Sequence, residues 1–219
     1  STPPHLSGEK DREKLPEVGD LLIDTGYTKE ELDGLVRIGT PVGFYPKYTE
    51  LLNSHIAGKG FDDKACAACA VKALAEIDRD KLAGDVYLLL SAHEETDRLG
   101  GVVCGTYEIK PDYAMVVDVN LGKTPDTKSY ETVDMGGGAA LTLSAVTDRR
   151  LTKMTAELCR KKEIKDQRIV SASSTGTNAT ALSLVRGGVP VVDVGLPLKS
   201  MQTYNEVLDL ADAEEMTKL

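Results

Sequence analysis

Acidic residues follow two apolar segments of the chain, at positions where carboxylates can do chemistry. Glu94 and Glu95 come shortly after the apolar run 86–90, and Asp118 directly follows the apolar run 113–117. A near-continuous apolar run of this length is typical of a strand buried on both faces. In open α/β sheets ligands bind beyond the carboxyl ends of the strands, so both runs deliver acids to the edge where a site belongs.

A second acidic pair, Asp62 and Asp63, stands at the start of a helix predicted over the Ala-rich segment 63–77. Carboxylates that share one edge repel each other, and divalent cations that accept oxygen ligands remove this conflict. In a two-metal hydrolase one carboxylate bridges the ions, and another takes the proton from the attacking water. The alternative is that each acid is a solvated loop residue or a helix N-cap.

The rest of the pattern predicts the elements that position these acids. Apolar runs alternate with amphipathic segments, which favours an α/β fold with a layered, mostly parallel sheet. In the N-terminal stretch, Thr28 and Glu31 have the spacing of a capping box, so a helix is expected to begin there. The predicted strands are 21–24, short segments within 39–48, 86–90, 113–117, 139–144, 168–170 and 189–196; the predicted helices are 63–77, 150–162 and 179–186.

Composition excludes several classes of partner. The formal net charge is −9 and the isoelectric point is near 4.9, which argues against nucleic acid and against an anionic membrane surface. No apolar run approaches the roughly 18 residues of a spanning helix, and the start has no signal-peptide pattern. Four cysteines without framework spacing fit a reducing cytoplasm.

Two further patterns have ordinary interpretations. Cys66 and Cys69 form a Cys-x-x-Cys pair without a second Cys or His pair nearby, so we expect them to be small core residues of a helix. Cys104 and Cys159 are expected to be buried free thiols.

A glycoside hydrolase could also use paired carboxylates, but aromatic residues make up only 5% of the chain and leave little for stacking sugars.

The segment 58–64, Gly-Lys-Gly-Phe-Asp-Asp-Lys, resembles the Gly-Lys-Ala-x-Asp-Asp-Arg segment of the M42 family of dinuclear metallo-aminopeptidases. The resemblance continues in order through 94–95, 118–119, 176–179 and 195–201, and 3–6 and 22–26 resemble the family's accessory β module. It implies the fold of the dinuclear zinc peptidases, two divalent ions (zinc or cobalt) and release of N-terminal residues from a peptide substrate.

The resemblance also implies roles for individual residues. Asp62 corresponds to the carboxylate that bridges both metals, and Glu94 to the general base. Glu95 and Asp118 correspond to ligands of one ion each. The loop placed at the substrate pocket consists of Gly176, Thr177 and Asn178.

Both histidine ligands of the family are absent from their expected positions. Gln202 stands where the family has its C-terminal His, and no His-x-Asp segment precedes the accessory module. None of His5, His55 and His93 matches either position, and we expect them to be exposed or packed side chains. Gln is a poorer zinc ligand than imidazole. We therefore expect weak metal binding and slow hydrolysis, or, alternatively, a non-catalytic scaffold or peptide-binding protein.

The resemblance further predicts the domain organisation and assembly. Residues 1–57 are expected to be part of a β-rich accessory module, and residues 58–219 an α/β catalytic domain without its N-terminal strands. The family commonly builds closed homo-oligomers such as dodecamers, so a homo-oligomer is expected for this chain as well.

Overall fold

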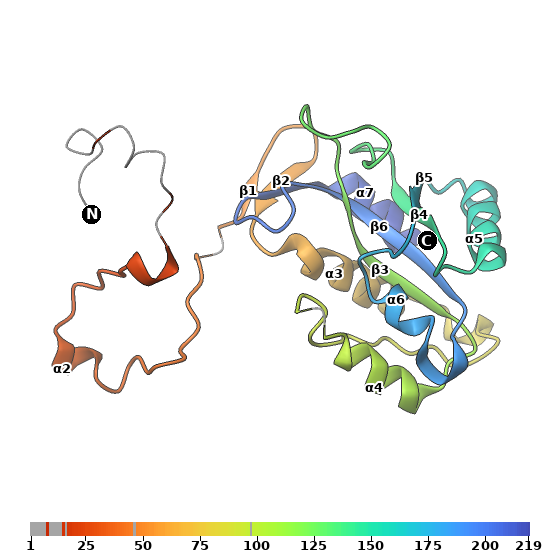
Figure 1. Cartoon of the computed structure of the whole chain (residues 1–219). Helices are drawn as coiled ribbons and strands as arrows, with labels where there is room; N and C mark the ends of the chain where they lie inside the picture. The colour runs from red at the N-terminus through yellow and green to blue at the C-terminus, as the bar shows by residue number, and fades with distance from the viewer. Residues whose placement is uncertain (1–7, 9–14, 16, 46, 97) are drawn as a thin grey trace. The chain divides into compact units, whose positions relative to one another are not determined.

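The computed structural model describes residues 8, 15, 17–45, 47–96 and 98–219, and the chain divides into two compact units, residues 1–43 and 44–219 (Figure 1). This division lies earlier in the chain than the boundary after residue 57 suggested by the sequence. The reason is that strand β2 (His55–Gly58) pairs with strand β7 (Glu206–Asp209) and is part of the sheet of the second unit.

The described part of the first unit contains two short helices, the 3-10 helix η2 (Val18–Asp20) and α2 (Lys29–Leu32). The capping box is confirmed: Thr28 Oγ1 accepts a hydrogen bond from Glu31 N at 3.3 Å, and Glu31 Oε2 accepts one from Thr28 N at 2.8 Å. The strand expected over 21–24 is not formed. Its apolar side chains are exposed, and the described residues of this unit offer no other strand to pair with.

A single sheet of seven strands organises the second unit, in the order β1-β2-β7-β6-β4-β5 with β3 paired to β6. Strands β3 and β6 run parallel, as do β4 and β5, whereas the other four pairings are antiparallel. The α/β class is confirmed, but the sheet is mixed rather than mostly parallel. The remaining strands are β1 (Thr49–Glu50), β3 (Ala114–Leu121), β4 (Ala139–Ser144), β5 (Asp166–Ser171) and β6 (Val191–Lys199).

A short connection explains the antiparallel pairing of β6 with β7. Strand β7 follows β6 after only the turn 200–205, and a parallel pair needs a crossover of a dozen or more residues. The chain therefore runs back along β6, with Leu198 opposite Leu208, and β2 adds to the far side of β7. This return brings the turn 200–205 to the same region as the end of β2, where helix α3 begins.

Two further expected strand regions are wrong. The segment 86–90 lies outside the sheet, and most of its side chains are exposed, for example Tyr87 at 63% and Leu90 at 62%. An apolar run becomes a buried strand only when neighbours pair with it and cover its faces, and the described residues supply no such neighbour here. The β segments expected within 39–48 are also absent from its described residues, since the first strand begins at Thr49.

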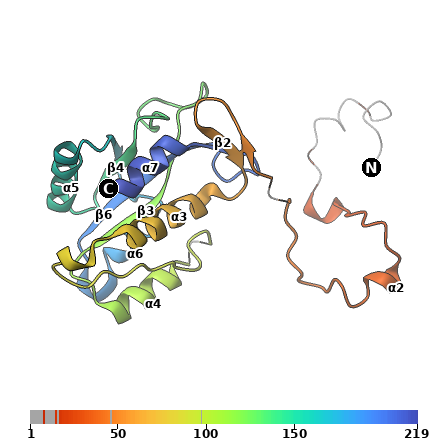
Figure 2. The same ribbon diagram turned by 180° about the vertical axis from the view of Figure 1, so that it is seen from behind.

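Helices cover the sheet, and Figure 2 shows α3 and α7 in front of it. The segment 63–77 forms α3 and the segment 150–162 forms α5, as expected, whereas 179–186 divides into α6 and a 3-10 turn. In the described part of the chain no helix is both long enough and apolar enough to cross a bilayer. The helices of this unit are α3 (Phe61–Glu76), η3 (Arg79–Lys81), α4 (Gly100–Ile109), α5 (Arg149–Lys162), α6 (Ala179–Leu182), η4 (Val185–Gly187) and α7 (Leu210–Lys218).

The hydrophobic core lies between β6 and the α3–α7 layer. Every residue of β6 except the last is buried, and Leu196 is fully inaccessible. Cys66 and Cys69 are buried core residues of α3, as expected, and Cys159 is buried on α5. Cys104 is exposed on α4, so the prediction of a buried thiol there is wrong. All four cysteines are free.

Candidate metal centre

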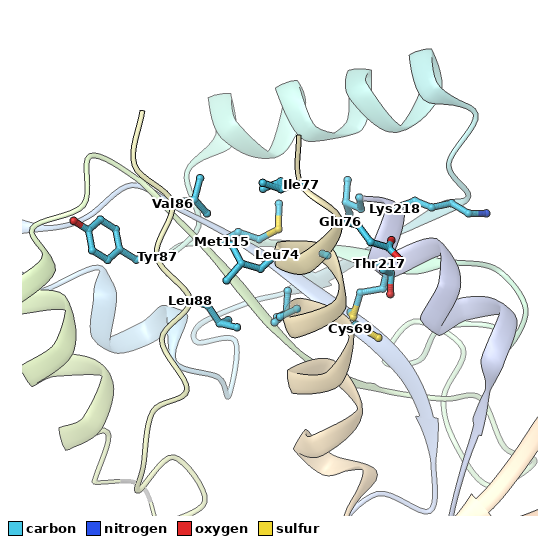
Figure 3. Close-up of a pocket in the computed structure, with 15 residues that line it drawn as sticks. Cys69, Leu74, Glu76, Ile77, Val86, Tyr87, Leu88, Met115, Thr217 and Lys218 are labelled. Carbon is cyan, nitrogen blue, oxygen red and sulfur yellow. The ribbon is translucent and has the colours of Figure 1, made fainter. Parts of the chain in front are cut away.

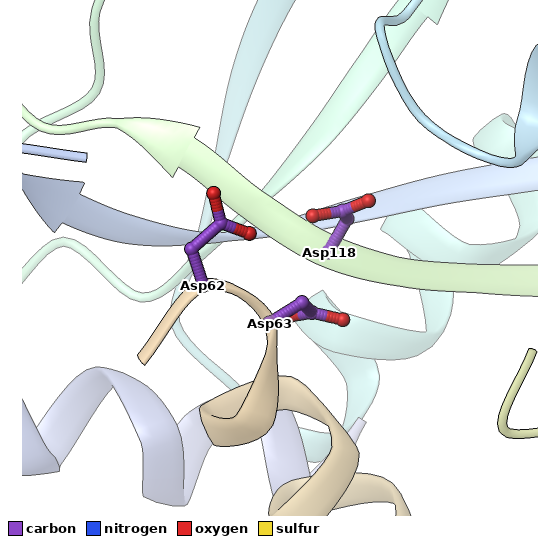
Figure 4. Close-up of side chains that lie close together, drawn as sticks. All are labelled: Asp62, Asp63 and Asp118. Atoms are coloured by element: carbon purple, nitrogen blue, oxygen red, sulfur yellow. The ribbon is translucent and has the colours of Figure 1, made fainter. Parts of the chain in front are cut away.

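Asp62 and Asp63 lie in the first turn of α3, just after the chain leaves β2. Gly60 precedes them with φ of 76°, in the left-handed region that favours glycine. The backbone of both aspartates departs from helical angles, with ψ of 111° at Asp62, and the peptide bond between them is cis. Both side chains lie beside strand β3 (Figure 4).

Asp118 lies inside strand β3, opposite Gly195 of β6, rather than at the end of a strand as the sequence suggested. Its side chain is only 9% exposed, and its Oδ1 accepts a hydrogen bond from Val119 N at 2.7 Å. Its main-chain oxygen accepts a hydrogen bond from Cys66 Sγ at 3.0 Å. This contact ties helix α3 to β3 at the level of the carboxylates.

Three aspartates meet at this point. One carboxylate oxygen from each of Asp62, Asp63 and Asp118 can be chosen so that all three oxygens lie within 4.8 Å of one another (Figure 4). We call this group the carboxylate cluster. It unites two residues predicted as metal ligands, Asp62 and Asp118, with Asp63, for which the sequence predicted no ligand role. Glu95, which was also predicted to be a ligand, is not a member of the carboxylate cluster found among the described residues.

Burial and mutual repulsion raise the pKa of every carboxyl group in the cluster. Desolvation is the largest cause, and the pKa is about 7 for Asp62, about 7 for Asp63 and about 8 for Asp118. The next largest effects that raise the pKa are the charges of Glu95 and Glu206 on Asp62, and of Asp63 on Asp118. Without a cation the cluster therefore retains protons near neutral pH.

Glu94 and Glu95 lie in the segment between 86–90 and α4, close to the cluster. A hydrogen bond with Glu95 contributes to the raised pKa of Asp62. The negative charge of Glu94 acts on all three aspartates and raises each of their pKa values. The structure thus brings the glutamate pair into the electrostatic neighbourhood of the cluster, although the segment before it is not a strand.

The loop 176–178, predicted to approach the substrate, contacts the same neighbourhood. Asn178 Nδ2 donates a hydrogen bond to Ser91 Oγ at 3.1 Å, and Ser91 begins the segment that carries the glutamate pair. Thr177 Oγ1 donates to Oδ1 of the buried Asp193 at 2.9 Å, which anchors the loop to β6. Asn178 precedes α6, but its side chain makes no capping hydrogen bond.

Gln202 and the histidines lie outside the carboxylate cluster. Gln202 is exposed in the turn 200–205, and its main-chain N–H donates to Glu206 Oε1 at 3.0 Å. His93 is exposed and His55 is half-buried, and neither belongs to the cluster. His5 lies outside the described residues.

Glu206 is a carboxylate beside the cluster that the sequence did not single out. It begins strand β7, is only 1% exposed, and its Oε2 accepts hydrogen bonds from the main-chain N–H groups of Phe61, at 2.6 Å, and Asp62, at 3.4 Å. The donors lie some 145 residues earlier in the chain. No local pattern could have indicated this pairing.

The donor set of the cluster fits a divalent cation. Its ligand atoms are carboxylate oxygens, which hard and borderline divalent ions accept. Asp63 Oδ1 is buried and has no hydrogen-bond partner. An acceptor oxygen of this kind is costly to bury unless it receives a proton or a cation. The cluster therefore presents a place where a cation would relieve both repulsion and an unsatisfied acceptor.

We expect the metal-free chain to lose stability as the pH rises. A carboxyl whose pKa is raised in the folded state binds more protons folded than unfolded between its unfolded pKa, near 4, and its folded pKa, about 7 or 8 here. In EDTA, the urea midpoint should therefore be lower at about pH 8.5 than at about pH 5. With a saturating divalent cation, the urea midpoints at the two pH values should lie closer together. A midpoint that rises with pH in EDTA would contradict the raised pKa values.

Fold and site together define an α/β protein with a buried carboxylate cluster beside the parallel strand pair β3–β6. The chain is 28% identical to the lysyl aminopeptidase of Pyrococcus furiosus over 99% of its own length and 63% of the relative's. It superposes on an aminopeptidase from Desulfurococcus kamchatkensis with a TM-score of 0.83 at 28% identity, covering 99% of this chain and 61% of that one. A TET1 peptidase from Pyrococcus horikoshii has the same fold, with a TM-score of 0.75 at 24% identity, covering 100% of this chain and 64% of that one.

The whole chain, residues 1–219, matches the family model of the M42 glutamyl aminopeptidases, and the protein belongs to this family. The chain spans less than two thirds of the length of the relatives it matches.

Proposed function

We propose that this chain supplies carboxylate ligands and the general base of a metal-dependent aminopeptidase site that releases N-terminal residues from peptides. The observation that carries the proposal is the meeting of Asp62 and Asp118, from segments far apart in the sequence, in one buried cluster. Membership of the M42 family supports the same activity. The endoglucanase-type alternative is less favoured, because aromatic residues, which stack on sugars, make up only 5% of the chain.

The proposed roles follow the residue-by-residue resemblance. Asp62 would hold both of two divalent ions, zinc or cobalt, and Glu95 and Asp118 would each hold one of them. Such ions, when bound, polarise the scissile carbonyl and lower the pKa of a water. Glu94 would act as the general base that takes the proton of the attacking water, and its charge acts on every member of the cluster.

The substrate's amino terminus is proposed to enter between the glutamate pair and the loop 176–178. The hydrogen bond from Asn178 to Ser91 joins this loop to the segment of Glu94 and Glu95, so one peptide end could contact both. A cationic amino group is attracted to a site with several carboxylates, which favours a free N-terminus over an internal peptide bond.

The same residues support a proposal of impaired activity. In place of an imidazole, the family's C-terminal His position carries Gln202, and neither His55 nor His93 lies in the cluster. A set of oxygen ligands holds zinc more weakly than one that includes imidazole. The alternative proposal is a non-catalytic scaffold that retains the fold for peptide binding, and it is favoured if metal binding is absent.

Residues 58–219, which carry all of the proposed site residues, are proposed to form the catalytic α/β domain. A cavity of about 480 Å³ opens between α3, the segment 86–88 and β3 (Figure 3). Its lining includes Leu74, Val86 and Met115, and the last two side chains are nearly half exposed. The apolar surface along 86–90 is the kind that a further strand covers.

Assembly and location are also proposals. One relative is described as assembling into a tetrahedron or a large octahedral shell, and we propose that this chain likewise associates with copies of itself. The 43 residues of the first unit support this, because its apolar side chains, such as Leu22 at 95% exposure, find no core within the described residues of that unit. Four free cysteines fit a reducing compartment, the cytoplasm.

Hydrolysis of an aminoacyl anilide with added zinc or cobalt tests the function. We expect slow, chelator-sensitive release of the anilide that is lost in Glu94→Gln, because the general base is removed while the ligands stay. Loss of a general base typically costs about 100-fold or more in rate. Glu157→Gln, the same substitution at an exposed position of α5, is the matched control. Activity that survives Glu94→Gln would assign the chemistry elsewhere, and no activity with any metal would favour the scaffold.

A further inference from the structure

Glu206 joins two separate turns through its carboxylate. Oε2 accepts a hydrogen bond from the main-chain N–H of Phe61 at 2.6 Å and a longer one from Asp62 at 3.4 Å. Oε1 accepts one from the main-chain N–H of Gln202 at 3.0 Å. The first turn places Asp62 in the carboxylate cluster. The second carries the residue at the family's histidine position.

The location of this carboxylate is electrostatically unfavourable without such partners. Glu206 is 1% exposed, and its negative charge adds to that of Glu95 in disfavouring ionisation of Asp62. A buried carboxylate needs several hydrogen-bond donors to offset its lost hydration. Backbone N–H groups supply them here, and these bonds are short-range and directional. The hydrogen bonds of this carboxylate therefore fix the geometry of the main chain that donates them.

We propose that Glu206 is a positioning residue that holds the Phe61–Asp62 turn and the Gln202 turn at a fixed separation, and so fixes the main chain from which Asp62 reaches the carboxylate cluster. This inference rests on the proposed function, because it takes Asp62 to be a metal ligand. Glu206 itself contacts neither substrate nor metal in this account. Its effect on binding is transmitted through the main chain of the two turns.

The structure offers a matched control on the same strand. Asp209 is also a buried carboxylate of β7, at 6% exposure, and it accepts hydrogen bonds from Ser54 Oγ at 2.6 Å and Ala211 N at 2.9 Å. It touches neither of the two turns that Glu206 joins. Asp209→Asn and Glu206→Gln both remove one buried negative charge from β7, but only the second substitution weakens the link between the turns.

The test compares zinc affinity by calorimetry in the full chain. Glu206→Gln should weaken zinc binding by about 10-fold or more, the range found for residues that orient metal ligands. Asp209→Asn should change it by less than about twofold. Glu206→Asp keeps the negative charge but shortens the side chain by one methylene. Its zinc affinity should lie between those of Glu206→Gln and Asp209→Asn. Equal losses of affinity in Glu206→Gln and Asp209→Asn would overturn the proposal, since a loss of general stability would explain both.

A second readout separates this inference from the proposed function. In the metal-free chain, hydrogen exchange at the amides of Phe61 and Gln202 should accelerate in Glu206→Gln and stay unchanged in Asp209→Asn. If zinc does not bind at all but both amides respond, the metal assignment fails and the positioning role stands. If zinc binds and the two amides do not respond, the positioning role fails and the metal site stands.

Discussion

Asp118→Asn should lower the affinity of the chain for zinc by at least about 100-fold, because it removes a charged, buried ligand from the carboxylate cluster. The same substitution should stabilise the metal-free protein at about pH 8.5, since it relieves the repulsion and desolvation that raise the pKa of Asp118 to about 8. The Asn side chain keeps an oxygen that can accept the hydrogen bond from Val119 N.

The prediction for Asp118→Asn is specific because zinc affinity should fall while the stability of the metal-free protein should rise. Zinc affinity is measured by calorimetry and stability by urea unfolding in EDTA, with Asp193→Asn as the control for a buried aspartate outside the cluster. Asp193→Asn should leave zinc affinity unchanged. If Asp118→Asn binds zinc as tightly as the unchanged chain, Asp118 is not a ligand. If it lowers the stability of the metal-free chain, the carboxyl is not under the electrostatic strain described here.

Gln202→His should tighten zinc binding by about 10-fold or more, because an imidazole nitrogen replaces a neutral amide at the position the family uses. The main chain of residue 202 is already tied to Glu206, which also holds the turn of Asp62, so the new side chain starts from a fixed backbone. The gain should therefore shrink when Glu206→Gln is present in the same chain.

A neighbouring position supplies the control for Gln202→His. Asn205→His adds an imidazole to the same exposed turn, three residues further on, where the resemblance places no ligand. It should leave zinc affinity within about twofold of the unchanged chain. Equal tightening by both substitutions would mean that any added histidine near the turn binds zinc, and no tightening by Gln202→His would remove residue 202 from the metal centre.

Much of the site could be predicted from residues in sequence order. The strands predicted over 113–117 and 189–196, and the helix predicted over 63–77, follow from apolar periodicity, and the structure forms all three as β3, β6 and α3. The sequence places Asp118 after an apolar run and Asp62 at the start of a helix, and the family resemblance assigns both to one metal centre; the structure brings the two side chains together. The two carboxylates lie close together although Asp118 lies within strand β3 and not at its end.

Other features depend on contacts that no local pattern contains. In the sequence, Glu206 is an ordinary acidic residue after a polar turn. Because β7 runs back along β6 and pairs with β2, its side chain becomes a buried acceptor for the main-chain N–H of Phe61. The run 86–90 has the composition of a central strand, but composition cannot tell whether neighbours are present to pair with it. Helix α7 was missed because its residues are mostly polar and its core contacts rest on Met216 and its neighbours.

Titration of the unchanged chain with zinc, in two buffers that differ in ionisation enthalpy, tests the central claim most directly. Near neutral pH the cluster retains protons, since the pKa values of its aspartates are about 7 to 8. We expect saturable binding of about one or two zinc ions per chain, with release of protons that makes the measured heat differ between the buffers. Absence of saturable binding, or binding without proton release, would contradict a metal centre built on Asp62 and Asp118.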